Sequence, residues 1–307
     1  MRKMIDVAII GGGPAALGAA LYAARSGMSV TIFEKKFVGG QASTTYEIDN
    51  YLGFTTSPSG SELTEKMTEH VSGFGVKFRY NEVKELVLDG DIKKIITAKK
   101  EFEAKTVILA MGATPALLAV PGENELTGKG VSYCATCDGM FFKDKTVCVV
   151  GGGNTAVEDA IYLSPLAKKV YIIHRRDEFR ASLLLVERLK GFDNVEFVME
   201  SRVTKINGDD CVESVTVDTK GDIYDIKTDA LFVAVGTIPA SDLIGNTITT
   251  HNGFIVTDET MATNIPGVFA AGDIRKKVLR QVITAVADGA VAGEEAAKYV
   301  NANKNAF

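Results

Sequence analysis

The chain of 307 residues contains two copies of one pattern, offset by 140 positions without a gap. The first copy opens with Asp6-Val-Ala-Ile-Ile-Gly-Gly-Gly-Pro14, and the second with Thr146-Val-Cys-Val-Val-Gly-Gly-Gly-Asn154. Further on, Tyr22 matches Tyr162. Each copy reads as a strand, a glycine turn, a helix and a strand. Short apolar runs that alternate with helical stretches indicate parallel sheets with helical crossovers, so the repeat predicts an α/β chain with two similar units.

Two further segments resemble each other and are expected to be the points where the chain crosses between domains. Thr106–Pro115 and Asp229–Pro239 each read as a buried strand followed by glycine and proline. A strand at Gly267–Ala271 and an alanine-rich helix from about Gln281 to Val300 follow. We therefore predict a discontinuous first domain, residues 1–114 plus 241–307, with a second domain, residues 115–240, inserted in it.

Composition excludes several classes of protein. The net charge of −5 argues against a basic nucleic-acid binder, and four cysteines are too few for a secreted disulfide scaffold. The uncharged run Val7–Ala24 is long enough for a membrane span, but Gly11–Pro14 would break a lone helix in lipid. The same glycines split the apolar stretch that a secretory signal would need. We therefore expect a cytoplasmic protein.

Both glycine turns match the dinucleotide-binding fingerprint G-x-G-x-x-G/A, with Ala16 and Ala156 in the last position. One match is weak evidence, because glycine before a helix is also ordinary turn chemistry. Two matches, each between an apolar strand and a helix, are much stronger. The first glycine makes the tight turn, the second lets the backbone approach a pyrophosphate, and the helix N-terminus attracts the anion. The turns predict two Rossmann-like, three-layer domains with ligand contacts at Gly11, Gly13, Pro14 and Ala15, and at Gly151, Gly153, Asn154 and Thr155.

The ends of the second strands distinguish the two ligands. In the first copy the strand ends at Glu34, whose carboxylate would accept hydrogen bonds from free ribose hydroxyls and repel a ribose phosphate. In the second copy the matching residue is His174, followed by Arg175 and Arg176, with Arg180 a few residues on. Guanidinium groups suit a phosphate, because they carry permanent charge and paired donors. The first site should hold FAD or NAD, and the second NADP(H).

The arginine cluster also has a plainer interpretation. It could be a solvated helix start in which Asp177 and Glu178 serve as salt partners. The arginines follow His174, which aligns with Glu34 at the predicted ribose contact, and this alignment favours the interpretation that they bind a phosphate.

The pair Cys134-Ala-Thr-Cys137 is followed at once by Asp138. A structural zinc site would need more ligands, and a structural disulfide is disfavoured in a cytoplasmic protein. A redox dithiol is the favoured interpretation, and no metal is expected. Asp138 could move the proton that the exchange requires, although Asp before Gly is also common in helix caps and turns. Cys148 and Cys211 are expected to be thiols without a chemical role.

The electron chemistry selects the first cofactor. A nicotinamide carries a hydride, and a disulfide is a poor direct acceptor of one. A flavin accepts the hydride and passes electrons on to a disulfide, so FAD fits the first site better than NAD. The predicted path runs from NADPH through FAD to Cys134 and Cys137, and on to an external disulfide.

Together, the stretch Cys134–Asp138, the paired glycine turns and the stretch His174–Arg180 resemble those of the low-molecular-weight, bacterial-type thioredoxin reductases. The resemblance covers essentially the whole chain. It implies FAD in the discontinuous domain, NADPH and the cysteine pair in the inserted domain, thioredoxin or a thioredoxin-like protein as partner, and a homodimer. In that family the inserted domain rotates as a body, and the crossings near Gly112 and Gly236 are the expected hinges.

The resemblance also implies roles for single residues. Cys137 matches the sulfur nearest the flavin, Cys134 the sulfur that attacks thioredoxin, and Asp138 the general acid. Ala16 departs from the third glycine, which the fingerprint tolerates. The implied FAD contacts, beyond those of the glycine turn, are Glu34, Lys35, Gly40, Gln41, Asn50, Val83, Ala110, Gly112, Gly272, Asp273, Arg280, Gln281 and Val282.

Some alternatives stay open at the level of sequence. Phe141 and Phe142, just after the cysteines, could dock a partner or could simply pack in the core. The scaffold also suits a ferredoxin-linked reductase or a dithiol oxidase, although the arginine cluster argues against both. A non-catalytic nucleotide-binding redox sensor is a third hypothesis, because fold alone does not prove turnover.

Overall fold

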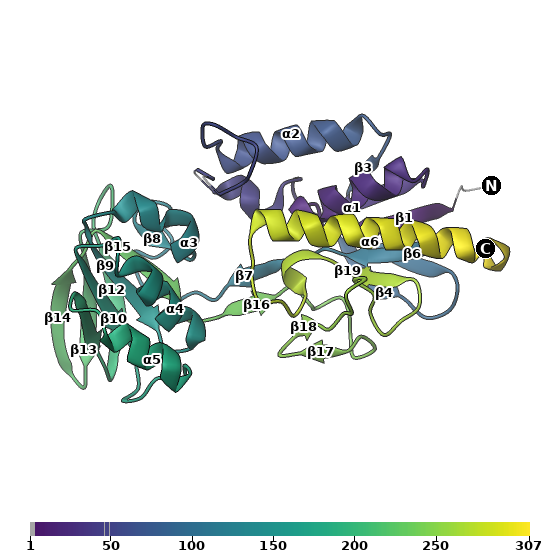
Figure 1. The fold of residues 1–307 in the computed structure, drawn as a ribbon. Coiled ribbons are helices and arrows are strands. Elements are labelled where there is room, and N and C mark those ends of the chain that lie inside the picture. Colours follow the sequence, from purple (N-terminus) through teal and green to yellow (C-terminus); the bar gives the residue numbers. More distant parts are fainter. Residues whose placement is uncertain (1–3, 46, 49) are drawn as a thin grey trace. The chain divides into compact units, whose positions relative to one another are not determined.

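The computed structural model describes residues 4–45, 47–48 and 50–307. The chain forms two compact units, Met1–Thr114 with Ile238–Phe307, and Pro115–Thr237 (Figure 1). The second crossing falls between Thr237 and Ile238, slightly before the boundary that we predicted after residue 240. The two crossings are the strands β7 (Ala113–Pro115) and β16 (Thr237–Pro239), which pair with each other.

The first unit is built on a sheet with the strand order β3-β2-β1-β6-β5-β4, and β19 pairs with the second half of β6. β1, β2, β3, β6 and β19 run parallel, whereas β4 and β5 form an antiparallel edge. The strands are β1 (Ile5–Ile10), β2 (Val30–Glu34), β3 (Lys77–Tyr80), β4 (Val83–Val87), β5 (Lys93–Thr97), β6 (Glu101–Leu109), β17 (Thr250–His251), β18 (Phe254–Ile255) and β19 (Val268–Ala270). The helices are α1 (Pro14–Arg25), α2 (Gly60–Ser72) and α6 (Val282–Ala302), with short 3₁₀ helices η1 (Gly40–Thr44), η3 (Gly272–Ile274) and η4 (Lys304–Ala306).

The second unit is built on a parallel sheet with the order β11-β10-β9-β15-β8. α4 and α5 cover one face, and the antiparallel sheet β12-β13-β14 covers the other. The strands are β8 (Val131–Ser132), β9 (Thr146–Gly151), β10 (Lys169–Ile173), β11 (Val195–Val198), β12 (Ser201–Asn207), β13 (Ser214–Thr219), β14 (Asp222–Lys227) and β15 (Ala230–Ala234). The helices are α3 (Ala135–Asp138), α4 (Asn154–Leu163) and α5 (Leu183–Lys190), with the 3₁₀ helix η2 (Gly139–Phe142). The predicted three-layer α/β fold is confirmed.

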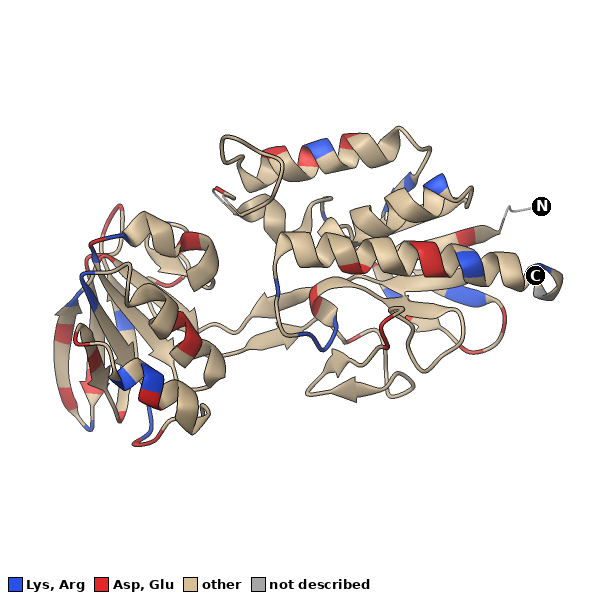
Figure 2. Ribbon diagram, in the orientation of Figure 1, with Lys and Arg blue, Asp and Glu red and all other residues tan. Residues whose placement is uncertain are grey.

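Helices α1 and α6 lie side by side in the first unit with their backbones in direct contact (Figure 1). A Cβ atom on Gly289 would lie 2.1 Å from the carbonyl oxygen of Ala15, and one on Gly18 would lie 2.6 Å from that of Val286. Gly293 meets Ala19 in the same way. Both helices are largely uncharged, and the charged residues of α6 other than Asp288 lie in its second half (Figure 2). Small residues on both helices therefore allow this close approach.

The contact between α1 and α6 generates a stability prediction. Gly289→Ala should lower the free energy of unfolding by about 2 kcal/mol, because overpacking against a carbonyl outweighs the roughly 1 kcal/mol gain in helix propensity. Urea unfolding measures the change. The exposed Val291 on the same helix supplies the control, since Val291→Ala should change stability by about 0.5 kcal/mol or less. A Gly289→Ala variant as stable as the parent chain would contradict the described packing.

Candidate active site

The first glycine turn is pressed against the end of a neighbouring strand. Gly11 has φ +104°, and a Cβ atom there would lie 2.4 Å from the carbonyl oxygen of Ala110. Gly13 precedes the first helical residue, Pro14, and within the described residues no side chain caps this end of α1. The first N–H groups of α1 are therefore available to an anion.

Glu34, at the end of β2, lies beside this turn. Its Oε2 would be 3.1 Å from a Cβ atom on Gly12, and its Oε1 accepts a hydrogen bond from the backbone N–H of Lys36 at 2.8 Å. Lys35 is exposed next to it. The acidic residue thus lies where the sequence register placed it, against the middle glycine of the turn.

The backbone of Gly39 and Gly40 meets the same turn, and other predicted contact residues of this unit are joined by hydrogen bonds to distant parts of the chain. The backbone of Gly40 approaches the turn so closely that a Cβ atom on Gly40 would lie 3.0 Å from the Cα of Gly13. Asn50 donates a hydrogen bond from Nδ2 to Oε1 of Gln281 at 3.1 Å, across 231 positions of sequence. Gln41 donates from Nε2 to the carbonyl oxygen of Ala113 at 2.5 Å. Three of the predicted contact residues are therefore held by specific hydrogen bonds in this unit.

Asp273 and Arg280 carry buried polar atoms without a protein partner. Asp273 Oδ1 and Arg280 Nε are both buried and have no hydrogen-bond partner within the described chain. Burial raises the pKa of Asp273, an effect that Lys277 and Arg280 oppose. The guanidinium of Arg280 packs over the ring of Phe254 at 4.3 Å. An unsatisfied buried acceptor and donor on neighbouring loops indicate a site for a polar ligand.

Asp288 organises this loop, and the sequence analysis missed it. Its Oδ2 accepts from Arg275 Nη1 at 2.9 Å, from Lys277 Nζ at 2.8 Å and from the backbone N–H of Gly272 at 3.1 Å. Gly272 in turn packs on α1, where a Cβ atom would lie 2.7 Å from the Cβ of Ala15. The remaining predicted residues of this unit are Val83 and Ala110, which are buried, Gly112, which has φ +71°, and Val282, which begins α6.

The second glycine turn reproduces the geometry of the first. Gly151 has φ +155°, and a Cβ atom there would lie 2.3 Å from the carbonyl oxygen of Ala234. Gly153 precedes α4 without a side-chain cap in the described residues. Asn154 accepts a hydrogen bond at Oδ1 from the backbone N–H of Ser182 at 2.9 Å, which ties the turn to the start of α5.

His174 lies beside the second glycine turn, as its alignment with Glu34 predicts, but its side chain is turned inward. Its side chain is buried against Gly152, stacks on Phe179 with ring centroids 5.4 Å apart, and contacts the carbonyl oxygen of Glu178 through Nε2 at 3.2 Å. Burial lowers the pKa of His174, and the nearby arginines lower it further. The buried imidazole thus packs against the middle glycine of the turn.

The three arginines of the cluster remain in solvent. Arg175, Arg176 and Arg180 are exposed, and none of them forms an ion pair with a carboxylate in the described part of the chain. Residues 175–181 form a loop, since α5 begins only at Leu183. The backbone N–H of Arg180 donates to the carbonyl oxygen of Gly152 at 2.7 Å, which fixes this loop beside the glycine turn, where Thr155 is also exposed.

The predicted cysteine pair is joined. Cys134 and Cys137 form a disulfide, and their Cα atoms are 5.3 Å apart. Cys134 precedes the short helix α3, and Asp138 is its last residue. The bond between the two sulfurs supports the redox interpretation over a zinc site. Of the other cysteines, Cys148 is buried, which raises its pKa to about 12, and Cys211 is exposed.

Ser132 contacts both ends of the redox turn. Its Oγ accepts a hydrogen bond from the backbone N–H of Cys134 at 3.1 Å and donates to Oδ2 of Asp138 at 2.5 Å. Nothing in the local sequence pattern marks this serine as different from other strand residues. Only the fold brings its hydroxyl to the carboxylate.

The two phenylalanines after the pair separate into two roles. Phe142 packs edge-on against Phe232 with ring centroids 5.8 Å apart, within the core of the second unit. Phe141 is 48% exposed, next to Met140 at 50%. Phe142 therefore packs against the core, and partner docking stays a prediction for the exposed Phe141.

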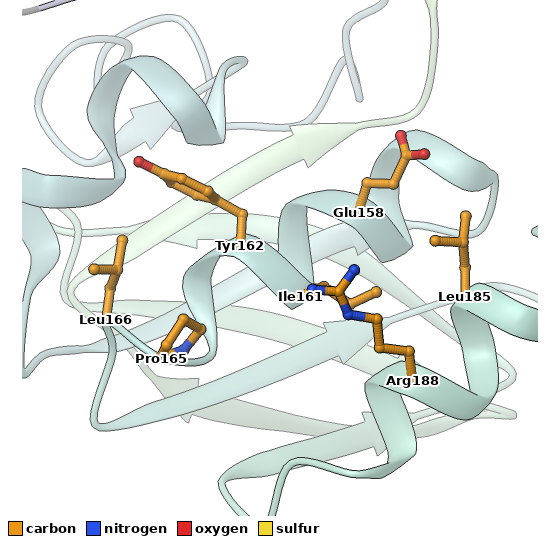
Figure 3. A pocket seen from close by; sticks show the side chains of 7 residues that line it. All are labelled: Glu158, Ile161, Tyr162, Pro165, Leu166, Leu185 and Arg188. Carbon is orange, nitrogen blue, oxygen red and sulfur yellow. The ribbon is translucent and has the colours of Figure 1, made fainter.

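A shallow groove of about 440 Å³ runs between α4 and α5 (Figure 3). Its lining is mainly apolar and includes none of the predicted ligand residues. The groove is lined by Glu158, Ile161, Tyr162, Pro165, Leu166, Leu185 and Arg188.

The comparisons with known proteins agree with this geometry. The family model for pyridine nucleotide-disulphide oxidoreductases matches residues 5–289. The chain is 49% identical to the thioredoxin reductase of Peptoclostridium acidaminophilum, with 99% of each sequence covered. It is 45% identical to that of Bacillus subtilis, with 97% of this chain and 96% of the relative covered. The crystal structure of thioredoxin reductase from Streptococcus pyogenes matches with a TM-score of 0.92 at 45% identity, covering 98% and 100% of the two chains.

The chain therefore belongs to the pyridine nucleotide-disulphide oxidoreductase family, among the thioredoxin reductases. The family resemblance that the motifs indicated is confirmed. In the part of the chain that the structure describes, no helix is long and apolar enough to cross a membrane.

The partly buried Asp159 of the second unit predicts a pH dependence of stability. Burial, with a smaller contribution from Glu158, raises the pKa of Asp159 on α4 from 3.8 to about 7. The folded state thus holds the proton more tightly than the unfolded state. Below the pKa of Asp159 in the unfolded chain, its burial causes no destabilisation. The destabilisation grows as the pH rises towards the folded-state pKa of about 7, and it reaches its full size above that pH.

Asp159→Asn should therefore stabilise the chain by up to about 4 kcal/mol at pH 8, with the gain shrinking steadily as the pH falls towards 4. Denaturant unfolding of parent and variant at several pH values measures it. The exposed Asp193 supplies a control, because Asp193→Asn should give no such pH-dependent gain. An equal gain for Asp159→Asn at pH 5 and pH 8 would contradict the shift.

Proposed function

We propose that this chain is an NADPH-dependent thioredoxin-disulfide reductase that holds FAD in its first unit and NADPH in its second. The observation that carries the proposal lies in the second unit. There a Cys134–Cys137 disulfide shares one domain with a nucleotide-type glycine turn and three exposed arginines. A disulfide and a site for a phosphorylated nucleotide in one domain are what a nicotinamide-driven disulfide reductase requires.

The residues of the first unit fit FAD. The open N-terminus of α1 suits its pyrophosphate, and Glu34 suits the ribose hydroxyls. The unpartnered Asp273 Oδ1 suits a ribityl hydroxyl, and Arg280 and Gln281 lie on the loop that leads into α6. When bound, FAD supplies a two-electron carrier that accepts a hydride from a nicotinamide and reduces a disulfide.

The residues of the second unit fit NADPH. The N-terminus of α4 suits the pyrophosphate of the dinucleotide. The exposed guanidinium groups of Arg175, Arg176 and Arg180 suit the 2′-phosphate, since no described carboxylate neutralises them. We assign this contact to the arginines alone, because the imidazole of His174 is buried.

Once reduced, the cysteine pair performs the exchange with the partner. The Cys134 thiolate attacks a sulfur of the thioredoxin disulfide, that bond breaks, and a mixed disulfide forms. Cys137 then attacks the Cys134 sulfur, which restores the Cys134–Cys137 bond and releases the second partner sulfur. Both protons of the dithiol end on the two partner thiols, and Asp138 transfers one of them. The family resemblance further supports a cytoplasmic homodimer. The exposure of Phe141, four residues after Cys137, makes it our candidate contact for thioredoxin.

A partner-coupled assay tests the proposal. Thiol formation should require NADPH, FAD-loaded protein and thioredoxin together. Cys137→Ser should abolish turnover while leaving the flavin spectrum in place, and the matched control Cys211→Ser should retain full turnover. Retained turnover in Cys137→Ser would overturn the dithiol path. A flavin that neither NADPH nor NADH bleaches would point to another electron donor, such as ferredoxin.

The arginine assignment predicts the nucleotide preference. The double variant Arg175→Ala/Arg176→Ala should raise the KM for NADPH by about 100-fold or more, because it removes two charge-assisted hydrogen bonds that contribute about 1.5–3 kcal/mol each. The KM for NADH should stay nearly constant. Arg188→Ala removes an exposed arginine from α5 and should change neither value. An equal loss with both nucleotides would show that the arginines act on the fold rather than on the phosphate.

A further inference from the structure

Ser132 joins the redox turn to the sheet. It ends β8, which pairs with β15 at the register Phe232↔Ser132, and its side chain is buried with 5% exposure. The short helix α3 follows directly and lies beside β8 (Figure 1). Because Ser132 has a short side chain on a paired strand, the sheet fixes the position of its hydroxyl group.

The hydroxyl makes two different contacts at once. As an acceptor it takes the backbone N–H of Cys134 at 3.1 Å, and as a donor it gives its single proton to Asp138 Oδ2 at 2.5 Å. The carbonyl oxygen of Cys134 is farther away, at 3.4 Å, so the carboxylate is the better acceptor for that proton. One buried atom thus holds both the residue that opens the redox turn and the carboxylate that closes it.

We propose that Ser132 is a positioning residue for the dithiol chemistry, acting through Asp138. It holds the carboxyl group, which directly follows Cys137, in the orientation needed to exchange a proton when the Cys134–Cys137 bond opens or closes. When an external thiolate attacks this disulfide, the S–S bond breaks, a new S–S bond forms to the attacker, and the departing cysteine thiolate takes a proton from Asp138. The inference rests on the role of Asp138 in the proposed function.

Two assays with Ser132→Ala separate this inference from the proposed function. The first follows opening of the Cys134–Cys137 disulfide by dithiothreitol, read by alkylation and mass spectrometry, and needs no nicotinamide, flavin reduction or thioredoxin. The second is NADPH-dependent thioredoxin reduction. We expect Ser132→Ala to slow disulfide opening about 10-fold and to lower kcat about as much with an unchanged KM for thioredoxin, a part of the usual 10²–10⁴-fold effect of proton transfer.

The control variants identify the route of the effect. Ser164→Ala removes another buried serine hydroxyl of the same unit, one that donates only to the carbonyl oxygen of Ala160 in α4, and should leave both rates unchanged. In an Asp138→Asn background, adding Ser132→Ala should cause no further loss. Thermal unfolding of each variant reports whether the fold is intact, and Ser132→Thr, which keeps the hydroxyl, should restore most of the rate.

The results of these assays either support or overturn the positioning role of Ser132. Parental rates in folded Ser132→Ala, or a full additional loss in the Asp138→Asn background, would overturn the inference. A third result separates the two proposals. If dithiothreitol opens the disulfide more slowly in Ser132→Ala, but not in the Asp138→Asn background, the role of Ser132 is supported even when the protein does not reduce thioredoxin. The proposed partner would then be rejected.

Discussion

The contact between a glycine turn and the end of a neighbouring strand is the constraint on which both proposed nucleotide sites depend. At Gly11 and at Gly151 the backbone lies so close to a strand carbonyl that no side chain fits, and both residues adopt positive φ. This contact aims the N-terminus of the following helix at the carboxyl edge of the sheet. It also places the end of the next strand, Glu34 in one unit and His174 in the other, beside the middle glycine. Both units therefore contain the same contact between glycine turn and strand, and the residues around each turn make the two sites different.

The difference between the sites lies in how their charges are balanced. In the first unit Asp288 pairs with both Arg275 and Lys277, while the buried Oδ1 of Asp273 has no hydrogen-bond partner among the described residues. In the second unit Arg175, Arg176 and Arg180 have no described acidic partner. The first arrangement suits a ligand that is held permanently by many neutral contacts. The second suits an exchangeable, highly charged one, because the long-range attraction of exposed cations accelerates binding and weakens with salt.

Local pattern was enough to predict the strands on either side of the glycine turns, the turns themselves, the cysteine pair and both crossings, because each depends on residues close together in sequence. It did not predict the edge strands β3, β4 and β5 or the antiparallel sheet β12-β13-β14. It was not enough for contacts made across the fold. The hydrogen bond between Asn50 and Gln281, and the roles of Ser132 and Asp288, depend on tertiary geometry that no single segment encodes. The register with Glu34 placed His174 correctly beside the turn, but it could not show that the imidazole would turn inward onto Phe179. Likewise, two adjacent phenylalanines have equal hydrophobicity, and only the core around Phe232 separates them.

The pairing of α1 with α6 has a consequence for how the chain is made. The first unit needs β19 beside β6, and the glycines of α6 against α1, before its core is closed. Those segments leave the ribosome last, after the whole of Pro115–Thr237. The inserted unit therefore has all its strands during synthesis while its host still exposes one face of an unfinished sheet. Because contacts between segments far apart in sequence form slowly, we expect the inserted unit to complete its fold before its host does.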